Sequence, residues 1–129
     1  MVTTHNKFLL LVCGSVLLLA GCYKNKTVYL DAPQITRTVT FSKDILPIFS
    51  KSCSLSGCHS SGAQAPNLTD ANAYNSLIIG NYINKSVPES SLIYLKMTGK
   101  KGTAMPPAGS NKDYNALILA WIQQGANNN

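Results

Sequence analysis

Two cysteines followed directly by a histidine form the segment of this chain with the clearest chemical potential. They are Cys53, Cys58 and His59, in the run Cys-Ser-Leu-Ser-Gly-Cys-His. Two closely spaced thiols can add to the vinyl groups of one porphyrin, and an imidazole directly after the second thiol can bind its iron. The usual spacing is Cys-x-x-Cys-His, whereas four residues separate the cysteines here. The segment therefore predicts a variant site of covalent haem attachment. A small-loop disulfide and half of a zinc site are the alternatives.

The first 21 residues have the features of a bacterial lipoprotein signal peptide. Lys7 precedes an apolar run from Phe8 to Ala20 that is too short to span a bilayer comfortably. The run leads into Leu-Ala-Gly-Cys, which resembles a lipobox and implies cleavage before Cys22 and acylation of that residue. An uncleaved anchor helix is the alternative, and the short length of the run disfavours it. We therefore expect a lipid anchor at Cys22.

Cleavage at this position changes which side chains can take part in chemistry. Of the four cysteines, one leaves with the signal peptide and Cys22 carries lipid, so Cys53 and Cys58 are the remaining thiols. His5 is removed as well, which leaves His59 as the one imidazole of the mature chain. This excludes a two-histidine zinc site, a second histidine on the same haem and catalysis by a separate histidine base. Beyond the inner membrane an unprotected thiol pair tends to oxidise, and haem attachment prevents this.

The charge of the chain argues against nucleic acid as a partner. The sequence has 11 Lys and Arg against 5 Asp and Glu, a formal net charge of +6. Loss of Lys7 with the signal peptide leaves a modest excess, and the basic residues form no dense stripe. Such an excess is typical of a solvated surface. It also suits a docking face for an acidic redox partner, for which Lys96, Lys100 and Lys101 are candidates.

Composition divides the mature chain into a tether and one small domain. Residues 22–40 are expected to form a lipidated N-terminus and a flexible tether, with a short strand near its end. The domain is expected to span residues 41–126, and residues 127–129 are expected to fray. A domain this small usually needs a staple, a metal or a cofactor, and a haem would supply a large apolar centre.

Apolar periodicity predicts an all-α domain. The first helix follows Ser42 as its N-cap and leads directly into the cysteine segment. A second lies between about residues 69 and 80, and a short third helix ends near Gly99. The last helix runs from Asn111 or Ser110 to Gly125 and has the strongest pattern. The side chains expected to face the core are Ile45, Ile48 and Phe49 in the first helix, Tyr74, Leu77 and Ile78 in the second, Leu92 and Leu95 in the third, and Tyr114, Leu117, Ile118, Trp121 and Ile122 in the last.

The order of these features resembles that of small monohaem cytochromes c of the lipoprotein type. The shared elements are the Phe-Ser-Lys-Asp-Ile-Leu-Pro-Ile-Phe helix, Cys53-x4-Cys58-His59, Ala104-Met105-Pro106-Pro107, and Trp121-Ile122 followed by Gly125-Ala126. They lie within residues 41–126 of the 129-residue chain. The two extra residues between the cysteines depart from the usual pattern of the family.

The resemblance implies one haem, held by thioether bonds to Cys53 and Cys58. It makes His59 the proximal iron ligand and Met105 the distal ligand, in a loop just before the final helix. A thioether is a soft ligand that raises the reduction potential when it replaces imidazole, and the prolines after Met105 restrict its position. Met97 is the competing candidate. Filling a gap in the core is the alternative role for a methionine.

These features predict a membrane-anchored electron carrier of the bacterial cell envelope, facing the periplasm or the cell surface. An iron with both axial positions filled has no site for a substrate, so it would pass electrons between redox protein partners. Two alternatives are open. If Met105 does not bind, an open iron would reduce peroxide or bind a small gas. In a non-haem lipoprotein, Cys53 and Cys58 would form a disulfide.

Overall fold

The computed structural model describes residues 33–129, and this part of the chain folds into helices and loops without a strand. The predicted all-α class is confirmed for these residues, whereas the short strand expected near residue 40 does not form. No helix in residues 33–129 is long and apolar enough to cross a membrane. The expected signal peptide, Cys22 and most of the expected tether lie outside the described residues.

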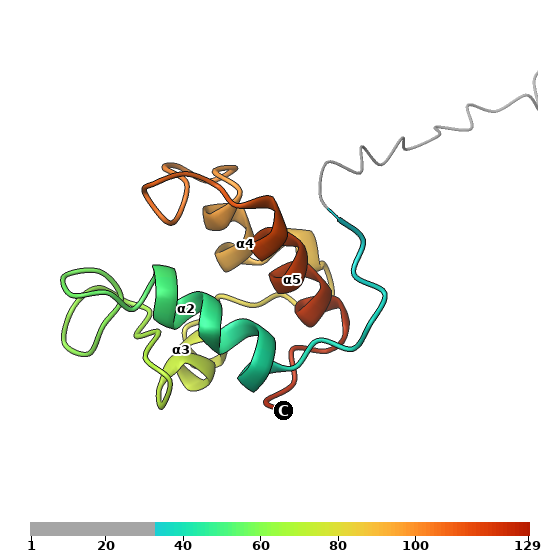
Figure 1. Ribbon diagram of the computed structural model, residues 1–129, viewed down its shortest axis with the longest axis horizontal. Helices are drawn as coiled ribbons and strands as arrows, with labels where there is room; N and C mark the ends of the chain where they lie inside the picture. Colours follow the sequence, from blue (N-terminus) through green and yellow to red (C-terminus); the bar gives the residue numbers. More distant parts are fainter. Residues whose placement is uncertain (1–32) are drawn as a thin grey trace, which may run out of the picture.

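The helices are short, and two long loops separate them. A π-helical turn, η1 (Phe41–Ile45), continues directly into α2 (Leu46–Ser52), and α3 (Ala73–Ile79) follows the first long loop. A 3-10 turn, η2 (Pro88–Ser90), precedes α4 (Leu92–Met97), and α5 (Lys112–Gln123) follows the second long loop. Figure 1 shows α4 beside α5, with both long loops projecting from the same end of the molecule.

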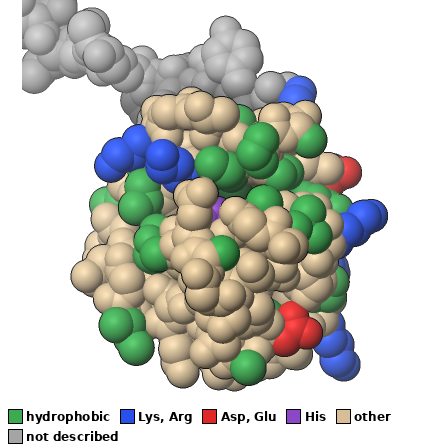
Figure 2. Space-filling view, turned by 90° about the vertical axis from the view of Figure 1, so that its left-hand side faces the viewer, with side chains coloured by type: hydrophobic (Ala, Val, Ile, Leu, Met, Phe, Trp, Pro, Cys, Tyr) green, Lys and Arg blue, Asp and Glu red, His purple; other side chains and the backbone are tan. Residues whose placement is uncertain are grey.

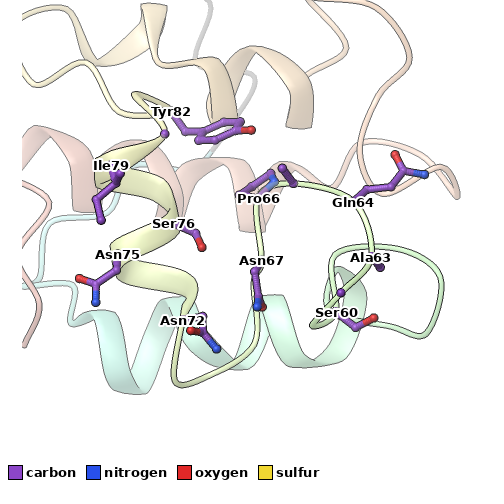
Figure 3. A pocket seen from close by; sticks show the side chains of 13 residues that line it. Ser60, Ala63, Gln64, Pro66, Asn67, Asn72, Asn75, Ser76, Ile79 and Tyr82 are labelled. Atoms are coloured by element: carbon purple, nitrogen blue, oxygen red, sulfur yellow. The ribbon is translucent and has the colours of Figure 1, made fainter.

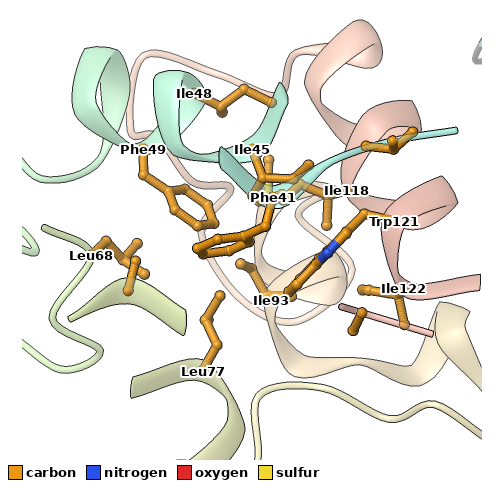
Figure 4. Packing of buried hydrophobic residues seen from close by; sticks show 14 of the residues in the cluster. Phe41, Ile45, Ile48, Phe49, Leu68, Leu77, Ile93, Ile118, Trp121 and Ile122 are labelled. Atoms are coloured by element: carbon orange, nitrogen blue, oxygen red, sulfur yellow. The ribbon is translucent and has the colours of Figure 1, made fainter. Parts of the chain in front are cut away.

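An aromatic cluster centred on Phe41 joins the first and last helices (Figure 4). The ring centroid of Phe41 lies 5.1 Å from the centroid of Trp121, 5.3 Å from that of Tyr74 and 6.3 Å from that of Phe49. Phe41 thus lies between the rings of Phe49 and Trp121. Such pairs contribute about 0.5–1.5 kcal/mol each beyond the area they bury. The other buried apolar residues of this core are Val39, Ile45, Ile48, Leu68, Ala73, Leu77, Ile93, Met97, Ile118, Ala120, Ile122 and Ala126.

The first helix begins earlier than the sequence indicated. Its N-cap is Thr40, and Ser42 instead donates its backbone N–H to the carbonyl of Asn129 (2.9 Å). Asp44 accepts hydrogen bonds from the backbone N–H of Thr40 (2.8 Å) and from its hydroxyl (3.2 Å), and pairs with Arg37 (2.7 Å). A carboxylate that reaches back to the N-cap supplements the helical hydrogen bonds and is favoured by the helix dipole.

The helix α4 turns a different face to the core from the one expected. Ile93 and Met97, one turn apart, are buried, whereas Leu92 and Leu95 are only partly buried. The N–H of Ile93 donates to the carbonyl of Tyr82 (3.2 Å), which fixes the start of α4 with Ile93 inward. This long-range hydrogen bond cannot be read from local periodicity.

The helix α5 confirms the strongest pattern in the sequence. Ile118, Trp121 and Ile122 are buried, with 0%, 1% and 1% of their surface exposed. The side chain of Asn111 accepts the N–H of Tyr114 (3.0 Å) and so caps the helix. Just beyond α5, Gly125 has a φ of +102°, a conformation that glycine adopts without steric cost and that ends helices.

The end of the chain packs against the beginning of the domain. The sequence predicted a frayed tail, but the indole N–H of Trp121 donates to the carbonyl of Asn127 (2.9 Å) and the side chain of Asn129 accepts the first N–H of η1 (2.9 Å). Val39 is buried, and its N–H donates to Gln124 (2.8 Å). The buried Val39 shows that the folded part begins before residue 41. The last residues belong to it as well, because they supply hydrogen-bond acceptors to the buried indole of Trp121 and to the first turn of η1.

Substitution of Asp44 by Asn should destabilise the domain in a pH-dependent way. The hydrogen bond from Arg37 lowers the pKa of Asp44 to about 2, against the effect of partial burial. A depressed pKa in the folded state means that the carboxylate stabilises the domain above about pH 4, and that this contribution is lost as the pH falls toward 2. Asp44→Asn should cost about 1 kcal/mol at pH 7, as loss of a helix cap does. Urea denaturation at pH 7 and pH 2.5 measures this.

The matched control for Asp44 is Asp113→Asn, since Asp113 is exposed in the first turn of α5. A difference between Asp44→Asn and the parent that persists undiminished at pH 2.5 would contradict the role given to Asp44.

Deletion of residues 127–129 should lower the free energy of unfolding by about 2 kcal/mol. The deletion leaves the buried indole N–H of Trp121 without its acceptor, and an unsatisfied buried donor costs about 1–3 kcal/mol. Denaturation followed by circular dichroism measures the loss, and Asn128→Ala, an exposed position, is the control. Equal stability of the deletion variant and the parent would show that the tail is dispensable.

Candidate functional site

A cleft of about 300 Å³ opens between the cysteine segment and α4. Its volume is that of a small-molecule or cofactor site. A smaller hollow of about 110 Å³ adjoins it, and both are bordered by Cys53, His59, Gln64 and Met105. On the face shown in Figure 2, a small patch of histidine is visible among hydrophobic side chains and other atoms. The apolar walls of the larger cleft are formed by Phe49, Pro66, Leu68, Leu92, Ile93 and Met97.

The structure brings together the sequence-predicted residues of the described domain. Cys53, Cys58, His59 and Met105 all border the smaller hollow, and all except Cys58 border the larger cleft. The predicted lipidation residue, Cys22, lies outside the described residues. Two loops from distant parts of the sequence thus place two thiols, an imidazole and a thioether around one apolar space.

The cysteine segment begins at the end of α2, beside the cleft. Cys53 is the C-cap of α2, and its N–H still donates to the carbonyl four residues earlier (2.8 Å). Cys58 closes a turn with the carbonyl three residues before it (2.9 Å), and the N–H of His59 donates to the carbonyl of Cys53 (3.1 Å). Gly57 has a φ of +76°, which is strained for other residues. These hydrogen bonds keep the backbone of His59 close to that of Cys53, although five positions separate the two residues in the sequence.

Two backbone carbonyls orient the ring of His59. Its Nδ1 lies 3.1 Å from the carbonyl oxygen of Pro66 and 3.3 Å from that of Gln64. When Nδ1–H donates to these acceptors, the lone pair of the neutral ring lies on Nε2, as a metal ligand requires. The carbonyl of His59 also accepts the N–H of Leu68 (2.8 Å), which holds the backbone in place. His59 is therefore arranged to act as a ligand through Nε2.

The two thiols are free, and one is poorly acidic. Neither Cys53 nor Cys58 is in a disulfide. Burial, together with the neighbouring Cys58, raises the pKa of Cys53 to about 11. Cys53 is thus protonated at neutral pH. Residues 33–129 also contain no cluster of three or more His, Cys, Asp and Glu that could hold a metal. The half-zinc alternative therefore lacks completing ligands in the described part of the chain.

The two candidate methionines lie in different environments. Met97 is 4% exposed and belongs to the hydrophobic core, although it also borders the larger cleft. Met105 is only partly buried and borders both hollows. Its N–H donates to the carbonyl of Lys96 (2.9 Å), and further along the loop Ser110 accepts a hydrogen bond from Asn115 of α5 (2.7 Å). The loop is thus held at two points, which favours Met105 as the ligand and Met97 as packing.

Sequence reasoning missed the segment 64–66 and Tyr82, which border the cleft. They also border an outer groove of about 440 Å³, drawn in Figure 3. The outer groove has no charged side chain and contains none of the predicted ligands. Its other hydrogen-bonding side chains belong to Ser60, Asn67, Asn72, Asn75 and Ser76. Nothing in the composition of this loop signals that its carbonyls orient His59, because the contacts are made by the backbone.

Comparison with known proteins found no matching family model, no matching curated protein and no matching solved structure. The residues around the cleft are therefore the basis for assigning a function.

Proposed function

We propose that the chain is a membrane-anchored monohaem c-type cytochrome that transfers electrons between redox protein partners. The observation that supports this proposal is the convergence of Cys53, Cys58, His59 and Met105 around the smaller hollow, which adjoins the larger apolar cleft. The donor set fits a covalently bound haem, since it combines two free thiols, an oriented imidazole and a soft thioether. A bound haem would supply reversible one-electron chemistry at its iron.

Each residue has a defined task in this proposal. The Cys53 and Cys58 thiols would each add across a vinyl double bond, with the sulfur bonding to one carbon and the thiol hydrogen going to the other. His59 would bind the iron through Nε2, while the carbonyls of Gln64 and Pro66 keep its ring in place. Met105 would supply a thioether ligand. The apolar walls limit access of water, which influences the reduction potential.

Electron transfer is preferred over an enzymatic function because of the way Met105 is held. The hydrogen bond from its N–H to Lys96, and that between Asn115 and Ser110 further along the loop, restrict the loop that carries it. A thioether held at the cleft leaves no coordination position for peroxide or a gas. The open-iron enzyme stays the alternative if Met105 does not bind, and the disulfide lipoprotein stays the alternative if no haem is attached.

The proposed lipid anchor places the carrier in the cell envelope, facing the periplasm or the cell surface. Because Val39 is buried in the core, the spacer is shorter than the sequence suggested. Residues 23–34, at roughly 3.5 Å each, reach at most about 40 Å from the lipid-bearing Cys22. Redox partners must therefore present their own cofactors within this distance of the membrane surface, allowing for the size of the domain itself.

Serine substitution of the two cysteines tests haem attachment. Cys53→Ser and Cys58→Ser should each weaken haem retention, because one thioether bond remains. The double variant should lose covalent attachment entirely. Haem staining on a denaturing gel and intact mass, after expression with haem maturation genes, measure both outcomes. A wild-type chain that carries no covalent haem under these conditions would refute the proposal and leave the disulfide alternative.

Alanine substitution of Met105 tests the distal ligand. Met105→Ala should keep the haem covalently attached but open a coordination position. The ferric spectrum should shift toward high spin, the reduction potential should fall, and affinity for carbon monoxide or cyanide should rise. Optical spectra and spectroelectrochemical titration measure these changes.

The control for Met105 is Met97→Ala, which should keep the low-spin spectrum and cost about 2–4 kcal/mol of stability through loss of packing. A high-spin Met97 variant beside an unchanged Met105 variant would reverse the assignment. If neither spectrum changes, the enzymatic alternative takes precedence.

A further inference from the structure

Lys96 is unusual among the described residues that border the cleft. Neither the larger cleft nor the smaller hollow is bordered by an Asp, Glu or Arg of the described chain, and Lys96 is the one lysine. The remaining walls are apolar groups, the proposed ligands, Gln64 and Tyr82. Lys96 is therefore the one lysine at a cavity that no Asp, Glu or Arg of the described chain borders.

The position of Lys96 is fixed by α4 and by the loop that carries Met105. Its backbone carbonyl accepts the N–H of Met105 (2.9 Å). Its Nζ lies 3.5 Å from the point that a Cβ on Gly102 would occupy, so the ammonium lies against the same loop. The methylene stem of a lysine packs on apolar surface while its charged end stays at a polar rim. Lys96 thus presents its charge where α4 and this loop meet.

The ammonium of Lys96 has no carboxylate partner within residues 33–129. The ion pair found there joins Arg37 to Asp44. Lys100, which is close in sequence, lies instead over the ring of Tyr94, with its Nζ 5.6 Å from the ring centroid. A positive charge without a partner beside an apolar cavity favours an anionic group on the molecule that fills the cavity.

Lys96 and Cys58 border different hollows of the site, whereas Cys53 borders both. Cys58 borders the smaller hollow but not the larger cleft, and Lys96 borders the larger cleft but not the smaller hollow. A haem carries its two propionates on an edge away from its vinyl groups. With the vinyl groups bonded to Cys53 and Cys58, the propionate edge extends away from Cys58.

We infer that Lys96 binds a propionate carboxylate of the haem at the mouth of the larger cleft, an inference that rests on the proposed function. This contact pairs the two charges and fixes the acidic edge of the porphyrin. The positive charge also favours the ferrous state, which carries one positive charge less than the ferric state. Lys96 is a positioning residue that acts on the cofactor through its carboxylate.

The test compares holoproteins with Lys96→Gln, Lys96→Arg and, as matched control, Lys100→Gln. At fixed pH and low salt, Lys96→Gln should move the ferrous–ferric equilibrium toward ferric by about threefold to tenfold, the effect expected of one charge near the iron at intermediate dielectric. Lys96→Arg should restore the parent equilibrium, and Lys100→Gln should have the smaller effect. Spectroelectrochemical titration measures all three. Proton NMR of the ferrous wild type should show nuclear Overhauser contacts between a propionate methylene and the Lys96 side chain.

Two outcomes would overturn the inference. One is an equal change of potential in Lys96→Gln and Lys100→Gln, and the other is a pair of propionates that both contact residues other than Lys96. The NMR measurement uses the wild type, so the inference stays testable even if a variant fails to fold. Absence of covalent haem from the wild type is a separate result, seen before any variants are compared, and it would refute the proposed function itself.

Discussion

The packing of Phe41 between Phe49 and Trp121 is the contact on which the rest of the structure depends. From this cluster α2 runs outward to Cys53, and α5 extends back from Trp121 toward the loop that carries Met105. The cysteine segment and the loop that carries Met105, which both border the cleft, are thus joined to helices that meet at one core. The cleft itself is apolar, and a small domain gains little stability from surfaces left in water. An apolar cofactor in this space would extend the core, since burial contributes about 25 cal/mol for each Å² removed from water.

Features that depend on neighbouring residues could be predicted from the sequence. The stripe Ile118, Trp121 and Ile122 repeats with the period of a helix, and the run from Cys53 to His59 carries its chemistry in adjacent residues. These features survive in the structure because each is a local property of the chain.

Features that depend on distant backbone contacts could not be predicted. The carbonyl of Pro66 contacts the ring of His59, and Tyr82 borders the cleft from a loop without periodicity. The side chain of Asn129 forms a hydrogen bond with the first turn of η1, which lies at the other end of the domain sequence. None of these roles leaves a pattern in residue type. The inward face of α4 was predicted wrongly for the same reason, since the hydrogen bond from Ile93 to Tyr82 sets its orientation.

The long spacing between the cysteines is accommodated outside the cleft. Leu55, between Cys53 and Cys58, is 49% exposed, so the additional residues extend into solvent. The hydrogen bond from the His59 N–H to the Cys53 carbonyl (3.1 Å) closes the segment and holds the backbone of His59 near the first cysteine. This arrangement is compatible with the proposed haem attachment in spite of the longer spacing.

The two sides of the proposed iron site are set by different parts of the fold. The proximal side depends on the carbonyls that hold His59, whereas the distal side depends on α4, whose Lys96 carbonyl holds Met105. Because α4 is anchored by Ile93 and Met97 in the core, the position of the distal sulfur follows the packing of that helix. Close-packed interiors transmit small changes in volume to their neighbours. The packing of Met97 in the core therefore contributes to the position of the loop that carries Met105.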